Sequence, residues 1–204
     1  RRGVVVTGNG SRWHWLRLGA SAAYSYTTTG VANVAPAGST ALVDIDGDGL
    51  DDFVFVRDPG TSISWRRNLT TGGTASFAAE AVLWTASPGT RIAAQPFVAA
   101  SLRFRSTERT ADFNGDGRGD LLLRVQVDGC GGTGGCTPNW TDGLQVFASR
   151  GTSLVPQAVL ENSADPLLAD FNADGLTDIA WSLAGTSARL LLATGRRGAA
   201  DAGF

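Results

Sequence analysis

The chain has 204 residues, of which 43% are hydrophobic, so it is long enough to bury the core of one or two ordinary domains. Its 19 acidic and 17 basic residues give a formal net charge of −2. No stripe of arginines interleaved with aromatic residues is present, which argues against nucleic-acid binding, and no apolar run reaches the length of a membrane span.

The first 38 residues predict three short strands. Gly3–Thr7 is a β-branched run, and aromatic residues alternate with their neighbours in Arg12–Leu18 and in 22–28. Aromatic residues at a period of two are typical of strands with one packed face. No acidic loop precedes these strands. We therefore interpret the segment as a repeat unit that lacks its first strand and its loop.

An acidic segment follows at 44–52, and it recurs at 112–120 and 170–178. All three copies share the pattern Asp, any, Asp or Asn, any, Asp, Gly, any, any, Asp. Oxygen-bearing side chains at alternate positions, a glycine bend and a final carboxylate match the ligand demands of Ca²⁺. An Asp-Gly hairpin turn explains one aspartate but not several mutually repelling carboxylates. The pattern therefore predicts three calcium sites, which also account for ten of the 19 acidic residues.

The acidic segments divide the rest of the chain into repeats. They begin 68 residues apart (44 to 112) and 58 residues apart (112 to 170), and strand patterns with Pro-Gly and Gly-Gly turns lie between them. Repeats of about 40 to 60 residues with four strands each are typical of propeller blades. We expect an all-β fold, a β-propeller or propeller segment over 1–204. Its four-stranded blades would be 1–38 (partial), 39–90, 91–165 and 166–204 (partial).

The two cysteines, Cys130 and Cys136, flank a glycine-rich spacer that can close a small loop. They are either a disulfide or half of a metal site, and no second Cys or His pair exists to complete such a site. A disulfide and Ca²⁺ sites both favour an oxidising, calcium-rich compartment, so we expect a secreted or cell-surface protein. No signal peptide is visible, and any targeting segment would have been removed or would lie upstream.

The acidic segments resemble the loops of the FG-GAP/VCBS repeat family, the integrin-α-like calcium-binding β-propellers. This resemblance implies one Ca²⁺ per loop and assigns the ligands. The side-chain ligands would be Asp44, Asp46, Asp48 and Asp52 in the first loop, Asp112, Asn114, Asp116 and Asp120 in the second, and Asp170, Asn172, Asp174 and Asp178 in the third. The backbone carbonyls of Leu50, Arg118 and Leu176 would complete the three sites. With four carboxylates, the first loop is expected to bind most tightly.

The chain departs from the family in two places. Ala173 stands where the other loops have Gly47 and Gly115, which would cost free energy if that position needs a positive φ. The Phe-Gly motif that gives the family its name has no clean copy here. Similar repeats occur in secreted bacterial proteins, including toxin shells of the Tc and Rhs types, in adhesins and in sugar-binding modules, so the resemblance implies a fold more than a function.

Catalytic candidates are few. His14, the single histidine, has no nucleophile motif around it, and the only glutamates are Glu80, Glu108 and Glu161. Most tryptophans fall at regular strand positions, which favours packing, whereas Trp140 in the predicted 128–142 loop is the best candidate for stacking on a sugar. We therefore expect a non-catalytic, calcium-stabilised scaffold that binds a protein partner or the remaining blades of a larger polypeptide. The alternatives are a carbohydrate-binding module and the propeller domain of a polysaccharide-acting enzyme.

Overall fold

The computed structural model describes residues 3–7, 12–18, 24–32, 40–57, 60–71, 76–88, 90–97, 111–128, 140–160, 166–183 and 187–193. Every regular element within these ranges is a β-strand, and no helix that could cross a membrane is found among them. The all-β prediction is confirmed. Cys130 and Cys136 lie outside the described residues, so the disulfide stays a prediction.

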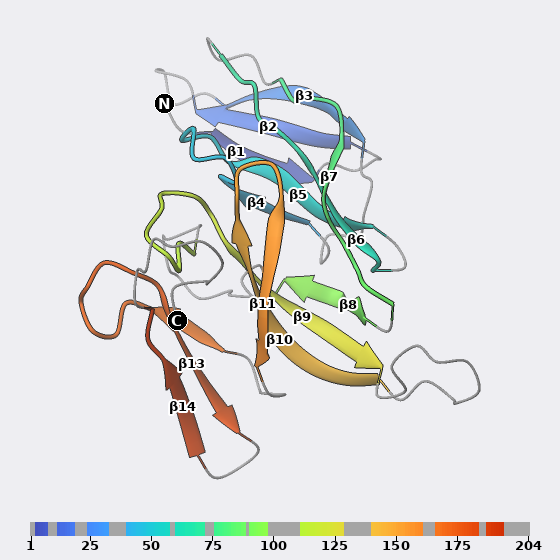
Figure 1. Ribbon diagram of the computed structural model, residues 1–204. Coiled ribbons are helices and arrows are strands. Elements are labelled where there is room, and N and C mark those ends of the chain that lie inside the picture. Colours follow the sequence, from blue (N-terminus) through green and yellow to red (C-terminus); the bar gives the residue numbers. More distant parts are fainter. Residues whose placement is uncertain are drawn as a thin grey trace.

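The strands form four antiparallel sheets, each a simple meander of sequence neighbours (Figure 1). The first sheet contains β1 (Gly3–Thr7), β2 (Arg12–Leu18) and β3 (Tyr24–Ala32). The second contains β4 (Thr40–Val43), β5 (Asp52–Arg57), β6 (Ser62–Arg66) and β7 (Ala81–Thr85). The third contains β8 (Thr90–Phe97), β9 (Leu121–Asp128), β10 (Trp140–Ser149) and β11 (Leu154–Leu160). The fourth contains β12 (Leu167–Ala169), β13 (Asp178–Leu183) and β14 (Ser187–Leu191).

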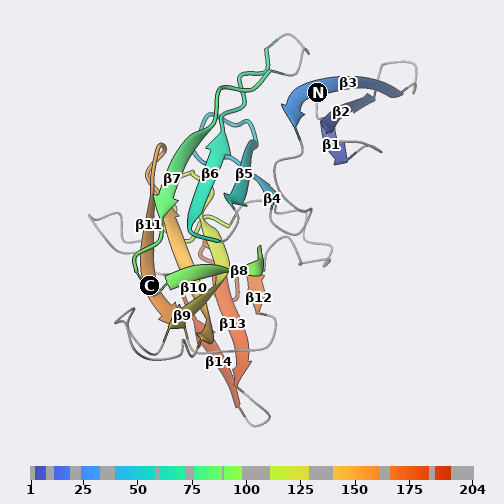
Figure 2. The same ribbon diagram turned by 90° about the vertical axis from the view of Figure 1, so that its right-hand side faces the viewer.

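The second, third and fourth sheets follow one another through the molecule in chain order (Figures 1 and 2). Each carries one acidic segment at the same place, between its first and second strands: β4 and β5, β8 and β9, and β12 and β13. The third sheet is strongly curled, and its register shifts between Ile92 and Phe97 and between Gln145 and Phe147 accompany the bend.

A first apolar cluster joins the second and third sheets. The second sheet contributes Val43, Ile45, Val54, Val56, Ile63, Trp65 and Leu83, and the third contributes Ile92, Leu121, Leu123, Val125, Phe147 and Leu154. All are 6% exposed or less, so water is excluded from the contact. Burial of this apolar surface, at about 25 cal/mol per Å², is the main force that holds the two sheets together.

A second apolar cluster joins the third and fourth sheets. Its buried members are Phe113, Leu122, Leu144, Val146 and Ile179, with Ala111, Leu168, Trp181 and Leu191 packed against them. Because side chains alternate across a strand, β9 supplies Leu121 and Leu123 to the first cluster and Leu122 to the second. The third sheet is therefore covered on both faces, which explains the unbroken apolar run at the start of β9.

Thr90–Phe97 forms β8, which pairs with β9 and completes the third sheet. The start of β10 differs from the sequence prediction. Trp140 was expected in an irregular loop at 128–142, but it begins β10 and pairs with Asp128 of β9. The glycine-rich segment gives no strand signal of its own. Trp140 belongs to a strand because it pairs with Asp128, which lies on the other side of that segment in the sequence.

Candidate metal centre in the acidic loops

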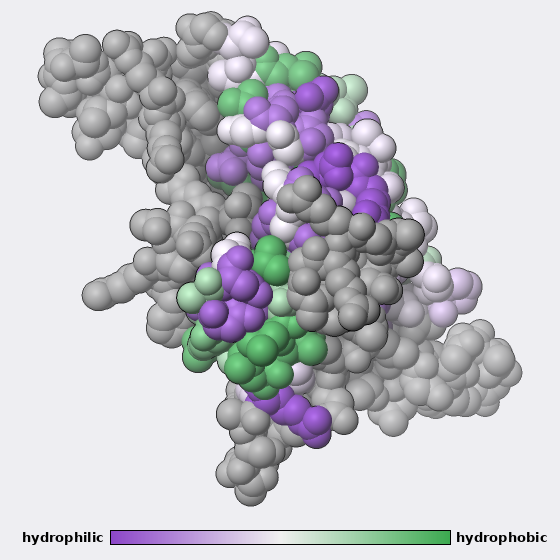
Figure 3. Space-filling model, turned by 60° about the vertical axis from the view of Figure 1, so that its left-hand side comes forward, coloured by the Kyte–Doolittle hydropathy of each residue, from purple (hydrophilic) through white to green (hydrophobic). Residues whose placement is uncertain are grey.

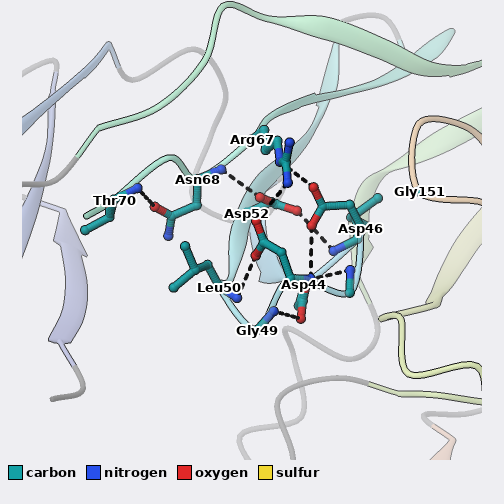
Figure 4. A network of polar contacts seen from close by, with 12 residues as sticks. Asp44, Asp46, Gly49, Leu50, Asp52, Arg67, Asn68, Thr70 and Gly151 are labelled. Carbon is teal, nitrogen blue, oxygen red and sulfur yellow. Dashed lines mark hydrogen bonds and ion pairs between the residues drawn. The ribbon is translucent and has the colours of Figure 1, made fainter. Parts of the chain in front are cut away.

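In each acidic loop the first aspartate organises the turn. Asp44 accepts hydrogen bonds from three backbone N–H groups: Gly47 (2.8 Å) and Asp48 (3.1 Å) to Oδ1, and Gly49 (2.8 Å) to Oδ2 (Figure 4). The corresponding donors to Asp112 are Gly115 (2.7 Å), Asp116 (3.2 Å) and Gly117 (2.9 Å), and those to Asp170 are Asp174 (3.1 Å) and Gly175 (2.9 Å). An aspartate that bonds to the N–H groups of the next residues is what bends the chain here.

The bend places two residues of every loop in the left-handed region. At the fourth loop position φ is 79° for Gly47, 70° for Gly115 and 62° for Ala173. This confirms that the position needs a positive φ. Ala173 therefore carries the conformational cost that glycine avoids, about 1 kcal/mol.

The first loop holds a carboxylate triad. Oxygen atoms of Asp44, Asp46 and Asp48 lie within 4.8 Å of one another, and within the described ranges this is the group of three acidic, His or Cys residues that could hold a metal ion. All the donors are hard oxygen atoms, which suits Ca²⁺ or Mg²⁺ rather than a soft metal. The triad could therefore bind a hard divalent cation.

The second and third loops have an amide in the middle of the same arrangement. Asn114 Oδ1 accepts a hydrogen bond from Asp116 N (3.0 Å), and Asn172 Oδ1 accepts one from Asp174 N (3.1 Å), as Asp46 Oδ1 does from Asp48 N (3.2 Å).

The backbone amides at the seventh loop position also have a common partner. Leu50, Arg118 and Leu176 each donate N–H to the fifth-position aspartate of their own loop at 2.9 Å. Ligation by the carbonyls of these three residues stays a prediction.

The ninth-position aspartates attach each loop to its sheet through hydrogen bonds. Asp52, Asp120 and Asp178 are buried, at 0%, 3% and 0% exposure. In each, Oδ2 accepts the N–H of the second loop residue: Ile45 (3.1 Å), Phe113 (3.0 Å) and Phe171 (2.9 Å). Oδ1 accepts an N–H at or just after the end of the sheet's third strand: Asn68 (2.7 Å), Ser149 (2.8 Å) and Ala193 (2.7 Å).

Burial dominates the electrostatics of Asp52 and Asp120. It raises the pKa of Asp52 and of Asp120 to about 7, although the backbone N–H donors favour the ionised form and act in the opposite direction. The sequence pattern treats all four aspartates of the first loop alike. The structure separates Asp52, which is fully buried and bonds to Ile45 and Asn68, from the triad of Asp44, Asp46 and Asp48.

Consecutive loops are bonded to each other, which sequence reasoning missed. The N–H of Gly119, at the eighth position of the second loop, donates to the carbonyl oxygen of Asp44 in the first (2.6 Å). The N–H of Thr177, at the same position in the third loop, donates to the carbonyl oxygen of Asp112 in the second (3.3 Å). The three loops therefore form a series in which each is placed by the one before it.

The remaining candidates show no catalytic arrangement among the described residues. Glu80 is paired with Arg57, which lowers the pKa of Glu80, and Glu108 and Glu161 lie outside the described residues. The backbone of His14 pairs with Val6 and Thr28 in the first sheet, where no side chain is described.

The tryptophans whose side chains are described are packing residues, as expected. Trp65 and Trp181 belong to the first and second clusters, and the Trp84 ring meets the Phe147 ring edge-on, with centroids 5.1 Å apart. A scan of protein-family models and a search of curated proteins find nothing similar to this chain.

Proposed function

We propose that this chain is a non-catalytic, calcium-stabilised scaffold of the FG-GAP/VCBS type, in which each meander sheet is a propeller blade. One observation carries the proposal: the same hydrogen-bonded acidic loop is built three times, and consecutive loops are bonded in series. A repeated loop of this kind gives a structural role to nearly all of the clustered aspartates. Among the described residues no comparable group of side chains is arranged for catalysis.

The proposed ligands follow the loop geometry. The three N–H donors to Asp44 orient its carboxylate, and the oxygens of Asp46 and Asp48 lie close enough to share a cation with it. Three such carboxylates repel one another, so a bound Ca²⁺ would lower the free energy of the folded loop. The second and third loops would bind through Asp112, Asn114 and Asp116, and through Asp170, Asn172 and Asp174. The ninth-position aspartates and seventh-position carbonyls would complete each site.

The proposed location is extracellular, on a secreted or cell-surface protein, where free Ca²⁺ is abundant. The proposed partners are proteins or further repeat sheets. The carbohydrate-binding and polysaccharide-acting alternatives gain no support from Trp65, Trp84 and Trp181, since these side chains pack between sheets.

Two measurements test the calcium proposal. We expect EDTA to lower the melting temperature and excess CaCl₂ to restore it, and an unchanged melt would overturn the structural role. In calorimetric titration, Asp46→Asn should weaken the tightest Ca²⁺-binding event, because it gives the first loop the same oxygen set as the other two. Glu80→Gln, which changes an acidic residue outside the loops, is the matched control and should leave the titration unchanged.

A further inference from the structure

The fourth sheet has one uncovered apolar face. Leu167, Phe171, Leu190 and Leu192 are 54%, 46%, 52% and 41% exposed. Leu167 and Leu190 both pair with Ala180 of β13, so these residues lie on one face of the sheet. A view of this side shows a continuous hydrophobic area in the lower half of the molecule (Figure 3). Most of the large exposed hydrophobic side chains of the described residues gather here, which is unusual for a solvent-facing surface.

The equivalent face is buried in both preceding sheets. Two residues after the ninth-position aspartate stand Val54, Leu122 and Ala180. Val54 (0% exposed) faces the third sheet in the first cluster, and Leu122 (1%) faces the fourth sheet in the second cluster. The second loop position shows the same contrast. Ile45 and Phe113 are fully buried, whereas Phe171 is half-exposed.

The backbone shows the same break in the series. The carbonyl oxygens of Asp44 and Asp112 each accept an N–H from the eighth residue of the next loop. Asp170 stands at the same position of the third loop, and the sequence holds no fourth copy of the acidic pattern. Among the described residues, neither the apolar face nor this carbonyl has the neighbouring sheet that the corresponding groups of the two preceding sheets have.

We propose that this uncovered face binds one further sheet of the same repeat. The acidic loop of that sheet donates its eighth-position N–H to the carbonyl oxygen of Asp170, and its apolar face covers Leu167, Phe171 and Leu190. This deepens the proposed scaffold function, but it rests on the stacking of sheets and not on calcium. The second sheet of another copy is a poor occupant, because Phe53 and Phe55, on the side that would have to dock, are already 1% exposed.

Ala173 restricts the loop that can dock. A Cβ at Gly115 would lie 2.8 Å from Leu176 Cδ2, whereas a Cβ at Gly47 would lie 3.3 Å from Arg118 Cγ. Because Ala173 already has a Cβ, an incoming loop with arginine at its seventh position fits better than one with leucine. The third sheet of this chain carries such a loop, and it serves as the probe.

The test extends the full chain at residue 204 with a second copy of residues 86–165. Hydroxyl-radical footprinting then measures oxidation of Phe171 and Leu190, which occur once in the extended chain. We expect their oxidation to fall severalfold relative to the unextended chain, while oxidation of Leu69 and Val82, exposed by 45% and 56% on the second sheet, stays unchanged. The double variant Phe171→Ser, Leu190→Ser should leave the added unit sensitive to protease.

Three results would overturn the inference. The first is unchanged oxidation of Phe171 in an extended chain whose added unit resists protease. The second is an added unit that stays protease-sensitive on the wild-type face. The third is a concentration-dependent loss of Phe171 oxidation in the unextended chain with a dimer in sedimentation, which would make a second copy the occupant. Footprinting in EDTA and in Ca²⁺ separates this inference from the calcium proposal. If the calcium proposal fails, EDTA leaves the melting temperature unchanged, whereas docking is read from the oxidation of Phe171 in either condition.

Discussion

The guanidinium group of Arg67 lies 3.0 Å from Asp48 Oδ2 and also forms an ion pair with Asp46 (Figure 4). Arg67 directly follows β6, so the second sheet delivers a positive charge to two members of the carboxylate triad. The hydrogen bond to Asp48 and the charge of Asp46 raise the pKa of Arg67 further, so it stays protonated. A built-in cation therefore contacts the oxygens that a metal ion would use.

We predict that Arg67→Gln tightens Ca²⁺ binding at the first loop, by roughly threefold at low ionic strength. The substitution removes a cation that competes for Asp46 and Asp48, and the difference should shrink in high salt because the pair is partly exposed. Calorimetric titration of both proteins measures the change.

Arg57→Gln is the matched control for that experiment. Arg57 is also paired with a carboxylate of the second sheet, Glu80, but it lies away from the loops. Its removal should leave the Ca²⁺ affinity as it is. Equal affinities for wild type and Arg67→Gln at low salt would show that the guanidinium does not compete with the metal.

The stability of the metal-free protein should depend on pH through Asp52 and Asp120. The pKa of each group is about 7 in the folded state, against 3.8 for an unperturbed aspartate. Between these two pH values the folded protein therefore binds more protons than the unfolded chain. This contribution to stability is complete below about pH 4 and is lost as the pH rises through 7. Each group can contribute a slope of up to about 1.4 kcal/mol per pH unit.

Urea denaturation in EDTA at pH 5.5, 6.5 and 7.5 checks this dependence. We expect the free energy of unfolding to fall across the series, and added Ca²⁺ to reduce the fall, because a nearby cation favours the ionised carboxylates. Asp120→Asn removes one of the two titrating groups and should flatten the profile. A profile that rises with pH in EDTA would contradict the prediction.

Local features of this chain could be predicted from sequence because they depend on residues close together. Strand patterns between Pro-Gly and Gly-Gly turns predict the strands of the second sheet, and the spacing of aspartates and glycines predicts three turns with the same geometry. The structure gives Ala173 the positive φ that Gly47 and Gly115 have at the same position. Arg67 was not identified, because nothing in the acidic pattern says which arginine the neighbouring strand will place beside the triad.

Contacts between sheets could not be predicted in the same way. The hydroxyl of Ser149 reaches the carbonyl of Ile45 across 104 residues, and the donors to Asp52 and Asp120 lie 16 and 29 residues away. These partners depend on where each third strand ends and on how one sheet stacks on the next. A periodic pattern carries no information on either. The hydrogen bonds by which the ninth-position aspartates attach each loop to its sheet are therefore seen only in the three-dimensional structure.

Ala173→Gly should stabilise the protein by about 0.5–1 kcal/mol. Glycine adopts φ near 62° without the cost that alanine bears, and this gain exceeds the added freedom of the unfolded chain. Gly115→Ala is the matched reverse change, and it should cost about 2 kcal/mol, since the new Cβ would also meet Leu176 Cδ2 at 2.8 Å. Urea denaturation of the two variants measures both effects. Equal stability of the two variants would show that the fourth loop position is not constrained.

Ser149→Ala should destabilise the stack of the second and third sheets. The buried hydroxyl donates to the carbonyl oxygen of Ile45 in the first loop (2.6 Å) and accepts from Gly151 N (3.1 Å). Its removal leaves a buried carbonyl and a buried N–H without this partner, which costs about 1–3 kcal/mol. Ser153→Ala, at an exposed position in the turn that follows, is the control and should change stability by less than about 0.5 kcal/mol. Because Ser149 N also donates to Asp120, the loss should be larger in EDTA than in Ca²⁺, where the loops are held by metal as well. If Ser149→Ala destabilises the protein equally in EDTA and in Ca²⁺, the contact between the two sheets does not depend on cation binding in the loops.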